Sequence, residues 1–483
     1  YEIVFGDWSS DVCSSDLGRA LAEFWLVPGY YCYSCELALR CRIKRASSLI
    51  MRQKTKIFAP YLCGKRNRLF DSAVTMVIVS LATASGSWPR ADDARLTAAG
   101  SKAESDVART LQVGPGRLLT KPSAAAAIAQ DGDVIEIDAG VYFGDVAVWT
   151  QNDLTIRGVG GLAHLEASGA HAQGKGIWVI KGDNTCIENI EFSGAAVPDE
   201  NGAGIRQEGR NLTVRRCYFH DNQEGILTDD DPTSEILIEY SEFARNGFGD
   251  GYSHNMYISC VGRFTLRYCY SHHAKIGHNI KSRALQNYLL YNRIMDEVEG
   301  TSSYAIDLPN GGLSFLIGNL IQQGPLTDNS TMISYGAEGL TNPQNELYVI
   351  NNTMIDDLGT GTFLYVRRGT VLAKLINNIF AGAGKMLSGS AEDITNLITD
   401  SPGLVNPGQY DYHLTSLSPA IDRGSDPGQS NGFSLMPVGQ YVHVAAGEAR
   451  AAKGNIDIGA YEYAGPTALR SEEHTSELQS PNT

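Results

Sequence analysis

Between residues 211 and 380 the chain repeats one pattern of apolar and polar positions, and the pattern returns roughly every 25 residues. Each copy has a short apolar strand, a polar corner, a second strand and a polar loop. Segments of this length cannot bury their own apolar face, so they stack on their neighbours, and short β-rich segments stack as parallel sheets. The copies are NLTVRRCYFHDNQEGILT (from Asn211), EILIEYSEFARNGFGDGYSHNMYIS (Glu235), RFTLRYCYSHHAKIGHNIKSRA (Arg263), NYLLYNRIMDEVEGTSSYAIDLPN (Asn287), LSFLIGNLIQQGPLTDNSTMISYG (Leu313) and ELYVINNTMIDDLGTGTFLYVRRG (Glu346).

This pattern predicts an all-β solenoid, and the preferred handedness of crossover connections makes it a right-handed parallel β-helix. Two earlier coils begin at Asp153 and Ile177. An alanine-rich segment predicts an N-terminal helix from near Ser123, which would cap the open edge of the sheets. Beyond Leu397 strand-like runs continue without the repeat, which predicts a C-terminal cap.

Asparagines recur at one corner of the coils, at Asn319, Asn352 and Asn378. Stacked amides at such a corner can hydrogen-bond along the axis of the solenoid. Cys217 and Cys269 occupy the equivalent corner two coils apart, which places them about 9 to 10 Å from each other, beyond the reach of a disulfide. We interpret them as small apolar residues that fill the corner.

Both ends of the chain carry segments that do not fit this fold. Residues 7–17 (DWSSDVCSSDL) and 470–480 (RSEEHTSELQS) resemble translated sequencing-library adapters in two orientations. We therefore interpret the residues before Met51 as adapter and upstream translation, and we do not read Cys32, Cys35 and Cys41 as a zinc site. From Met51 a basic stretch followed by the apolar run Ala73–Ala84 predicts a secretory signal.

The mature chain is therefore expected to be exported from a bacterium, and no later stretch approaches the 18 apolar residues of a membrane-spanning helix. The predicted organisation is residues 1–50 artefact, 51–84 signal peptide, 85–110 linker, 111–400 parallel β-helix, 401–463 C-terminal cap, and 464–483 tail and adapter.

The formal charge of -15 argues against a nucleic-acid partner, which would require a basic face. The 51 glycines and 23 tyrosines suit a turn-rich β protein, which we expect to be a monomer. If the partner is an acidic polysaccharide, a local cluster of lysine and arginine must overcome the global repulsion.

Such a cluster follows from alignment of the coils. The inward apolar column comprises Ile226, Met256, Ile280, Ile306, Ile333 and Leu364. Because side chains alternate along a strand, the next residue of each coil points outward. The outward face is then expected to hold Tyr257, Lys281 and Asp307, with Asn255 and Asn279 two places earlier and Arg283 two places later.

Tyr257, Lys281 and Asp307 would lie about 5 Å apart in succession, so that one sugar ring could meet all three. Eliminative cleavage of a uronate requires a neutralised carboxylate, a base and an acid. Lys281 is the candidate base if the like charge of Arg283 lowers its pKa. Arg283 is the candidate carboxylate ligand, and Tyr257 the candidate acid. Alternatively, Lys281 and Asp307 form an exposed ion pair worth less than about 1 kcal/mol.

Other polar residues extend the candidate site. His254 and His278 occupy equivalent positions, each before an asparagine, so they are expected to stack or to help bind substrate. Glu338 is a further candidate for substrate binding, and with Asp307 it would form the carboxylate pair of a hydrolase. His272 and His273 lack the spacing of a zinc motif.

The acidic residues Asp229, Asp230 and Asp250 lie on neighbouring coils. Their oxygens suit Ca²⁺, which prefers oxygen ligands. Asp229, Asp230 and Asp231, which precede Pro232, are equally ordinary turn residues. Asp230 with Asp250 is a second pair that would suit a hydrolase.

The coils and the segment before them resemble the pectate-lyase-like right-handed parallel β-helix superfamily. The phrases SPAIDRG and NIDIGAYEY near the C-terminal end resemble the choice-of-anchor Q segment of secreted β-helix proteins. Together these resemblances cover residues 111–463 and imply the fold, with possible attachment to the cell surface. They do not imply one chemistry, because lyases, hydrolases, epimerases and adhesins share the fold.

One coil, HNIKSRALQNYLLYNRI from His278, resembles the alginate lyase and chondroitinase B family. The resemblance assigns the role of Brønsted base to Lys281. In that family the next coil supplies an arginine as the acid, whereas here it reads AIDLPNGG, with Asp307 and no arginine. The acid is therefore left unassigned.

The sequence favours a secreted enzyme that cleaves an acidic, uronate-containing polysaccharide by β-elimination. Two alternatives stay open. A non-catalytic β-helix could bind glycans or mediate surface adhesion through tyrosines of its sheet face, and a glycoside hydrolase or epimerase could use the same scaffold.

Overall fold

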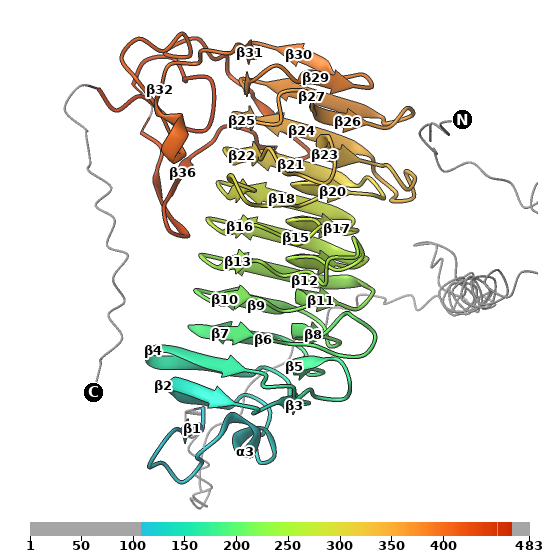
Figure 1. The fold of residues 1–483 in the computed structure, drawn as a ribbon, viewed down its shortest axis with the longest axis vertical. Coiled ribbons are helices and arrows are strands. Elements are labelled where there is room, and N and C mark those ends of the chain that lie inside the picture. The colour runs from blue at the N-terminus through green and yellow to red at the C-terminus, as the bar shows by residue number, and fades with distance from the viewer. Residues whose placement is uncertain (1–107, 452, 466–483) are drawn as a thin grey trace, which may run out of the picture. The chain divides into compact units, whose positions relative to one another are not determined.

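The computed structural model describes residues 108–451 and 453–465, and in this part of the chain it confirms a right-handed parallel β-helix. Figure 1 shows the coils stacked in order along the chain. Each coil contributes strands to three walls. The first wall is a ten-stranded parallel sheet of β3 (Ala147–Trp149), β5 (Gly176–Ile180), β8 (Ala203–Gln207), β11 (Glu224–Thr228), β14 (Met256–Ile258), β17 (Ile280–Ser282), β20 (Ile306–Leu308), β23 (Thr331–Tyr335), β26 (Thr362–Val366) and β29 (Lys385–Ser388).

The second and third walls are joined through the long strands β2 (Val134–Phe143) and β4 (Thr155–Glu166). The second wall also contains β1 (Thr110–Val113), β6 (Thr185–Glu188), β9 (Leu212–Arg215), β12 (Asp231–Glu239), β15 (Val261–Arg267), β18 (Gln286–Leu290), β21 (Leu313–Ile317), β24 (Glu346–Ile350), β27 (Leu372–Ile376) and β30 (Glu392–Ile394). The third wall contains β7 (Ile190–Ser193), β10 (Tyr218–His220), β13 (Glu242–Ala244), β16 (Tyr270–His272), β19 (Arg293–Met295), β22 (Leu320–Gln323), β25 (Thr353–Asp356), β28 (Ile379–Ala381) and β31 (Leu397–Ile398).

The apolar column predicted for the interior is confirmed by the strand register. Ile226 pairs with Met256, and Ile280 pairs with Ile306, which pairs in turn with Ile333. These side chains are 0 % exposed. Burying an aliphatic side chain of this size contributes about 1.5 to 3 kcal/mol, so the column supplies much of the cohesion between coils.

The predicted asparagine ladder is also present, at the corner between the second and third walls. The Asn319 amide donates to Oδ1 of Asn352 at 2.9 Å, and the Asn352 amide donates to Oδ1 of Asn378 at 3.0 Å. Asn352 also donates to the Leu316 carbonyl at 2.8 Å. The amides therefore satisfy the backbone groups that the turn exposes. Cys217 and Cys269 lie buried and unoxidised at the same corner in earlier coils.

The ends of the coil stack differ in structure. Near the N-terminal end, the helix α3 (Pro122–Ala126) packs beside β1 and β3. After β31 the chain forms three antiparallel pairs that lie beside the coils (Figure 1). These pairs are β32 (Leu404–Asn406) with β33 (Asp411–Leu414), β34 (Gln429–Ser430) with β35 (Phe433–Ser434), and β36 (Gly439–Val442) with β37 (Ala446–Ala449), and the 3-10 helix η1 (Pro407–Gln409) joins the first two strands.

Aromatic side chains fix this C-terminal segment to the outer face of the third wall. Tyr441 and Tyr461 are buried in one cluster with Tyr270, Met295 and Leu320 of the coils. Among the residues described, no helix is long and apolar enough to cross a membrane.

Several sequence predictions lie outside the described residues. These are the adapter segments, the signal peptide and nearly all of the linker at 85–110. The last linker residue, Thr110, is described and begins strand β1.

We predict that Asn352→Ala lowers the free energy of unfolding by about 3 kcal/mol, because it leaves buried partners of the ladder unsatisfied. Asn352 is 0 % exposed. The matched control is Asn406→Ala, because Asn406 is exposed and its side chain caps nothing. The control should change stability by less than about 0.5 kcal/mol. Denaturant unfolding measures both, and equal effects would show that the ladder does not stabilise the fold.

Candidate functional site

Three polar side chains stand in one row on the outer face of the first wall. Tyr257 of β14 pairs with Lys281 of β17, and Lys281 pairs with Asp307 of β20. Each is preceded by a buried residue of the apolar column, so alternation along these short strands sends all three outward. We call Tyr257, Lys281 and Asp307 the polar row.

The polar row is outward but closely covered. The Lys281 side chain is 12 % exposed and the Asp307 side chain 4 %. Nζ of Lys281 lies 3.9 Å from Oδ2 of Asp307 and 5.4 Å from the centre of the Tyr257 ring. The ammonium thus has an aromatic face on one side and a carboxylate on the other, and both attract a cation.

Arg283, just after β17, donates one hydrogen bond from each nitrogen of its guanidinium, to three different neighbours. Nε donates to the hydroxyl oxygen of Tyr257 at 2.8 Å, and Nη1 donates to Oδ1 of Asn310 at 2.5 Å. Nη2 donates to Oε2 of Glu338 at 2.7 Å. Because the guanidinium donates to Tyr257, this contact leaves the phenolic hydrogen available to another acceptor.

Glu338 places a carboxylate between the two cations of the site. Its Oε1 lies 3.5 Å from Nζ of Lys281, while its Oε2 accepts from Arg283. Burial favours the neutral acid, but the charges of Arg283 and Lys281 outweigh it and hold the pKa of Glu338 below its ordinary value. Its side chain is 49 % exposed, so this carboxylate stands at the solvent edge of the site. Lys281 and Arg283 together therefore form a carboxylate-binding pair.

Asp307 has an unusual environment for a carboxyl group. Burial raises the pKa of Asp307 to about 6, partly opposed by the charge of Lys281 and reinforced by that of Glu338. Oδ1 is buried without a hydrogen-bond partner, and Oδ2 lies 3.6 Å from Nε2 of His278. A carboxyl that titrates in this range exchanges its proton near neutral pH, which is a property of general acids and bases.

His254 and His278 stack, as predicted, with ring centres 4.5 Å apart. Nδ1 of His254 accepts from the backbone N–H of His278 at 3.0 Å. Burial lowers the pKa of His254 well below its usual value and the pKa of His278 to about 3, and nearby positive charges act in the same direction. Both rings are therefore neutral at neutral pH. They contact the polar row, because His254 packs against the Tyr257 ring and His278 lies beside the Asp307 carboxyl group.

Asn255 and Asn279 do not point outward, and their predicted position on the outer face is wrong. Both are 0 % exposed. Each precedes its three-residue strand and lies in the bend, where the alternation of a strand no longer applies. The Asn255 amide donates to Oδ1 of Asn279 at 2.9 Å, and Asn279 donates to Oγ of Ser302 at 3.2 Å. They form a second internal ladder and do not contact solvent.

The acidic residues Asp229, Asp230 and Asp250 have separate partners. Asp229 pairs with Arg206 at 2.7 Å, and Asp230 accepts from the backbone N–H of Cys260 at 2.8 Å. Asp250 accepts from the backbone N–H of Tyr252 at 2.9 Å. In the part of the chain that the structure describes, they do not form a group of three converging ligands. Calcium binding by these residues stays a prediction.

Three residues near the polar row escaped the sequence analysis. Glu224 is buried and accepts from the backbone N–H of His254 at 3.0 Å, and burial raises its pKa well above its ordinary value. Tyr304 packs on His278 with ring centres 5.0 Å apart. Asn310 follows Arg283 by 27 residues, close to one repeat, so extending the alignment past the strand ends would have found it.

Two further features lie on the third wall, away from the polar row. One is the group of His164, Glu191 and His220, whose ligand atoms lie within 4.8 Å of one another. A cleft of about 480 Å³ lies between Tyr218 and the β36–β37 turn.

Comparisons with known proteins agree with this architecture. The chain is a β-solenoid protein, and residues 139–321 match the family described as right handed beta helix region. The structure of pectate lyase Pel9A is similar with a TM-score of 0.50 and 12 % identity, over 74 % of this chain and 98 % of that chain. No curated protein matches the chain.

Two alginate lyases show weaker similarity. The enzyme from Paenibacillus sp. str. FPU-7 has a TM-score of 0.26 and 14 % identity, over 57 % of this chain and 95 % of that chain. The PL6 family alginate lyase AlyGC has a TM-score of 0.30 and 12 % identity, over 77 % of this chain and 59 % of that chain. At 12 % identity the pectate lyase comparison shows the fold alone. The family match ends at residue 321, so the choice-of-anchor resemblance of residues 401–463 stays a prediction.

The raised pKa of Asp307 predicts a pH-dependent stability difference between the wild type and Asp307→Asn. The folded state holds the Asp307 proton more tightly than the unfolded chain does. Protonation of Asp307 therefore contributes fully to the free energy of unfolding at low pH, and this contribution is lost as pH rises through about 6. Between about pH 3.5 and pH 7 the free energy of unfolding of the variant should rise relative to that of the wild type by up to about 3 kcal/mol. Denaturant unfolding across this range measures the difference. If the wild type instead becomes more stable than the variant as pH rises, the charge of Lys281 has a larger effect on the pKa of Asp307 than burial has.

Proposed function

We propose that this protein is a secreted enzyme that cleaves a uronate-containing polysaccharide by β-elimination at the polar row. The observation that carries the proposal is the joint binding of one carboxylate, that of Glu338, by Lys281 and Arg283. A uronate presents the same group beside its reacting carbon. We infer that the substrate carboxylate displaces Glu338, whose half-exposed side chain is free to swing toward solvent.

β-Elimination needs three groups in addition to the sugar. A base removes the proton at C5, the released electron pair forms the C4=C5 double bond, and the C4–O bond breaks as the leaving oxygen takes a proton. Neutralising the adjacent carboxylate stabilises the negative charge that develops at C5. Arg283 supplies this neutralisation. Lys281 is the base, and Tyr257 is the acid because its hydrogen is not used by Arg283.

Asp307 has a supporting role in this scheme. Its carboxyl lies 3.9 Å from Nζ of Lys281 and exchanges its proton near pH 6, because burial raises its pKa to about 6. Its carboxylate therefore stabilises the ammonium that forms when Lys281 takes the proton from C5. This scheme is written with the chain's own residues, and calcium binding by Asp229, Asp230 and Asp250 stays a prediction.

The fold supports the substrate class indirectly. One solved structure with the same fold is a pectate lyase, and its similarity at 12 % identity bears on the scaffold and not on the residues. The proposal therefore rests on the polar row and on Arg283. Export and attachment to a cell surface belong to the proposal as well.

A second function, glycan binding without catalysis, is favoured by a different observation. Each charge at the site already has a partner in the structure, since all three nitrogens of Arg283 donate hydrogen bonds and Lys281 lies between Asp307 and Glu338. A closed network of this kind also suits a rigid binding surface. The release of unsaturated products distinguishes the lyase from a protein that only binds glycans.

We predict that the wild type releases unsaturated products from alginate, pectate or a glycosaminoglycan, and that Lys281→Ala lowers the rate at least about 100-fold because the base is gone. The measurement is ultraviolet absorbance of the new double bond. Lys374→Ala is the matched control, because Lys374 also pairs with a carboxylate, Glu392 at 3.2 Å, but on the second wall. Equal rates for the wild type and Lys281→Ala on every polymer would remove the lyase role. Polymer binding without product from either protein would favour the binding function.

We predict that Glu338→Gln lowers KM for the cleaved polymer about threefold to tenfold, because a neutral amide competes less well with the substrate carboxylate. Steady-state kinetics at low ionic strength measure this change. A raised KM would mean that Glu338 assists substrate binding and does not occupy the carboxylate position.

A further inference from the structure

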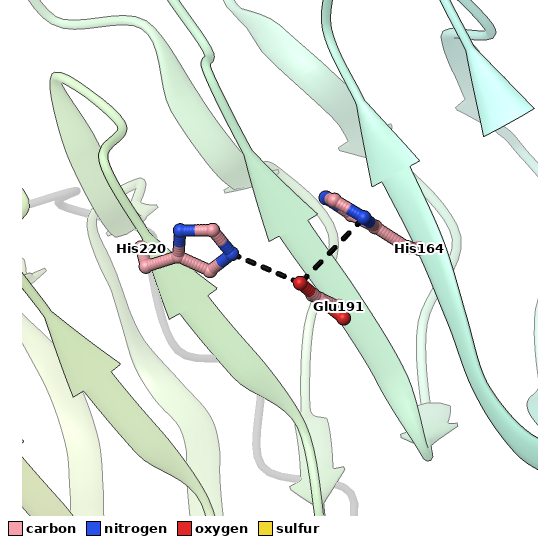
Figure 2. A group of neighbouring side chains, drawn as sticks. All are labelled: His164, Glu191 and His220. Atoms are coloured by element: carbon pink, nitrogen blue, oxygen red, sulfur yellow. Dashed lines mark hydrogen bonds and ion pairs between the residues drawn. The ribbon is translucent and has the colours of Figure 1, made fainter. Parts of the chain in front are cut away.

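Three side chains converge on the outer face of the third wall, on strands that carry no part of the polar row. His164 comes from β4, Glu191 from β7 and His220 from β10. His164 is the register partner of Glu191, and His220 is the partner of Ser193, two residues beyond Glu191. Figure 2 shows the carboxylate of Glu191 between the two imidazole rings.

The distances suit a shared ligand. Nε2 of His220 lies 3.0 Å and Nδ1 of His164 lies 3.6 Å from Oε1 of Glu191. One ligand atom from each residue lies within 4.8 Å of the other two. In a tetrahedral zinc site with bonds of about 2.0 to 2.1 Å, ligand atoms are about 3.4 Å apart. Small side-chain rotations therefore bring all three atoms onto one ion.

The nitrogens that face away from this centre have partners of their own. Nε2 of His164 lies 2.7 Å from Oγ of Ser193, and Nδ1 of His220 lies 2.8 Å from Oδ2 of Asp221. Asp221 is in turn held by Arg245 at 3.0 Å. Metal-binding histidines characteristically use the second ring nitrogen in this way, which fixes the ring orientation. Each imidazole here thus directs one nitrogen inward and anchors the other.

Other histidines of the described chain lack this convergence. His413 contacts Asp411 at 2.6 Å, and His272 contacts Glu242 at 3.1 Å, but in each case the carboxylate meets one imidazole. Among the residues described, His164, Glu191 and His220 form the one group of three such ligands. A carboxylate between two imidazoles on successive coils is therefore not a general feature of this surface.

We propose that His164, Glu191 and His220 bind one divalent transition metal ion of the zinc type. Two imidazole nitrogens and one carboxylate oxygen favour zinc and its neighbours over calcium and magnesium, which prefer oxygen ligands. The three side chains are 16 to 22 % exposed, so water can reach the ion on the side that the protein leaves open. The ion would join three consecutive coils at the N-terminal part of the solenoid.

The test uses the full chain, purified without a histidine tag, stripped with a chelator and titrated with Zn²⁺ by calorimetry. The double variant His164→Gln/His220→Gln should bind one ion fewer per chain than the wild type. His413→Gln is the matched control, because it removes a histidine paired with one carboxylate, and it should bind as many ions as the wild type. The difference in bound Zn²⁺ per chain between the wild type and the double variant counts only the ion at this site, because ions bound elsewhere are common to both proteins.

Two further measurements keep the proposal falsifiable. Glu191→Gln, which preserves side-chain shape, should weaken Zn²⁺ binding at this site at least about tenfold. Co²⁺ loaded in place of Zn²⁺ should give visible absorption that the double variant lacks, with far-UV circular dichroism unchanged. Equal ion counts in the wild type and the double variant would overturn the proposal, as would displacement of Zn²⁺ by a modest excess of Ca²⁺.

Discussion

The register between neighbouring coils is the constraint on which the whole structure depends. Parallel pairing fixes which residues meet, and the asparagine ladder locks the corner, because each amide bonds to the next coil and to a backbone carbonyl. The corner asparagines of successive coils are 27, 33 and 26 residues apart, at Asn292, Asn319, Asn352 and Asn378. Coil length therefore varies in the loops, while the strands keep their alignment.

This constraint explains how the candidate site forms. The coil that ends at Asn352 has 33 residues, and its extra length includes the loop that carries Glu338. That loop returns to Arg283, which lies 55 residues earlier in the chain. The register meanwhile holds Tyr257, Lys281 and Asp307 side by side. The polar row thus follows from the register, and the loop above it follows from one local change in coil length. Together they let Lys281 and Arg283 bind a carboxylate despite the acidic charge of the chain.

The sequence predicts what the repeat determines and misses what the repeat does not determine. The apolar column, the asparagine ladder and the adjacency of Tyr257, Lys281 and Asp307 all follow from alternation on aligned strands. Asn255 and Asn279 were misplaced because they lie in bends, where the two-residue period ends. The loop contact between Glu338 and Arg283 has no periodic signal. His164 and Glu191 lie before the repeats that begin at Asn211, and the spacings of 27 and 29 residues that join them to each other and to His220 differ from the repeat of roughly 25.

The candidate lyase site and the candidate metal site use different walls of one scaffold, so either can be correct without the other. The most direct test of the central claim is a crystal structure of the protein with a bound uronate oligosaccharide. The account predicts the sugar carboxylate between Nζ of Lys281 and the guanidinium of Arg283, with Glu338 displaced toward solvent. A sugar bound elsewhere, with Glu338 still joined to both cations, would contradict it.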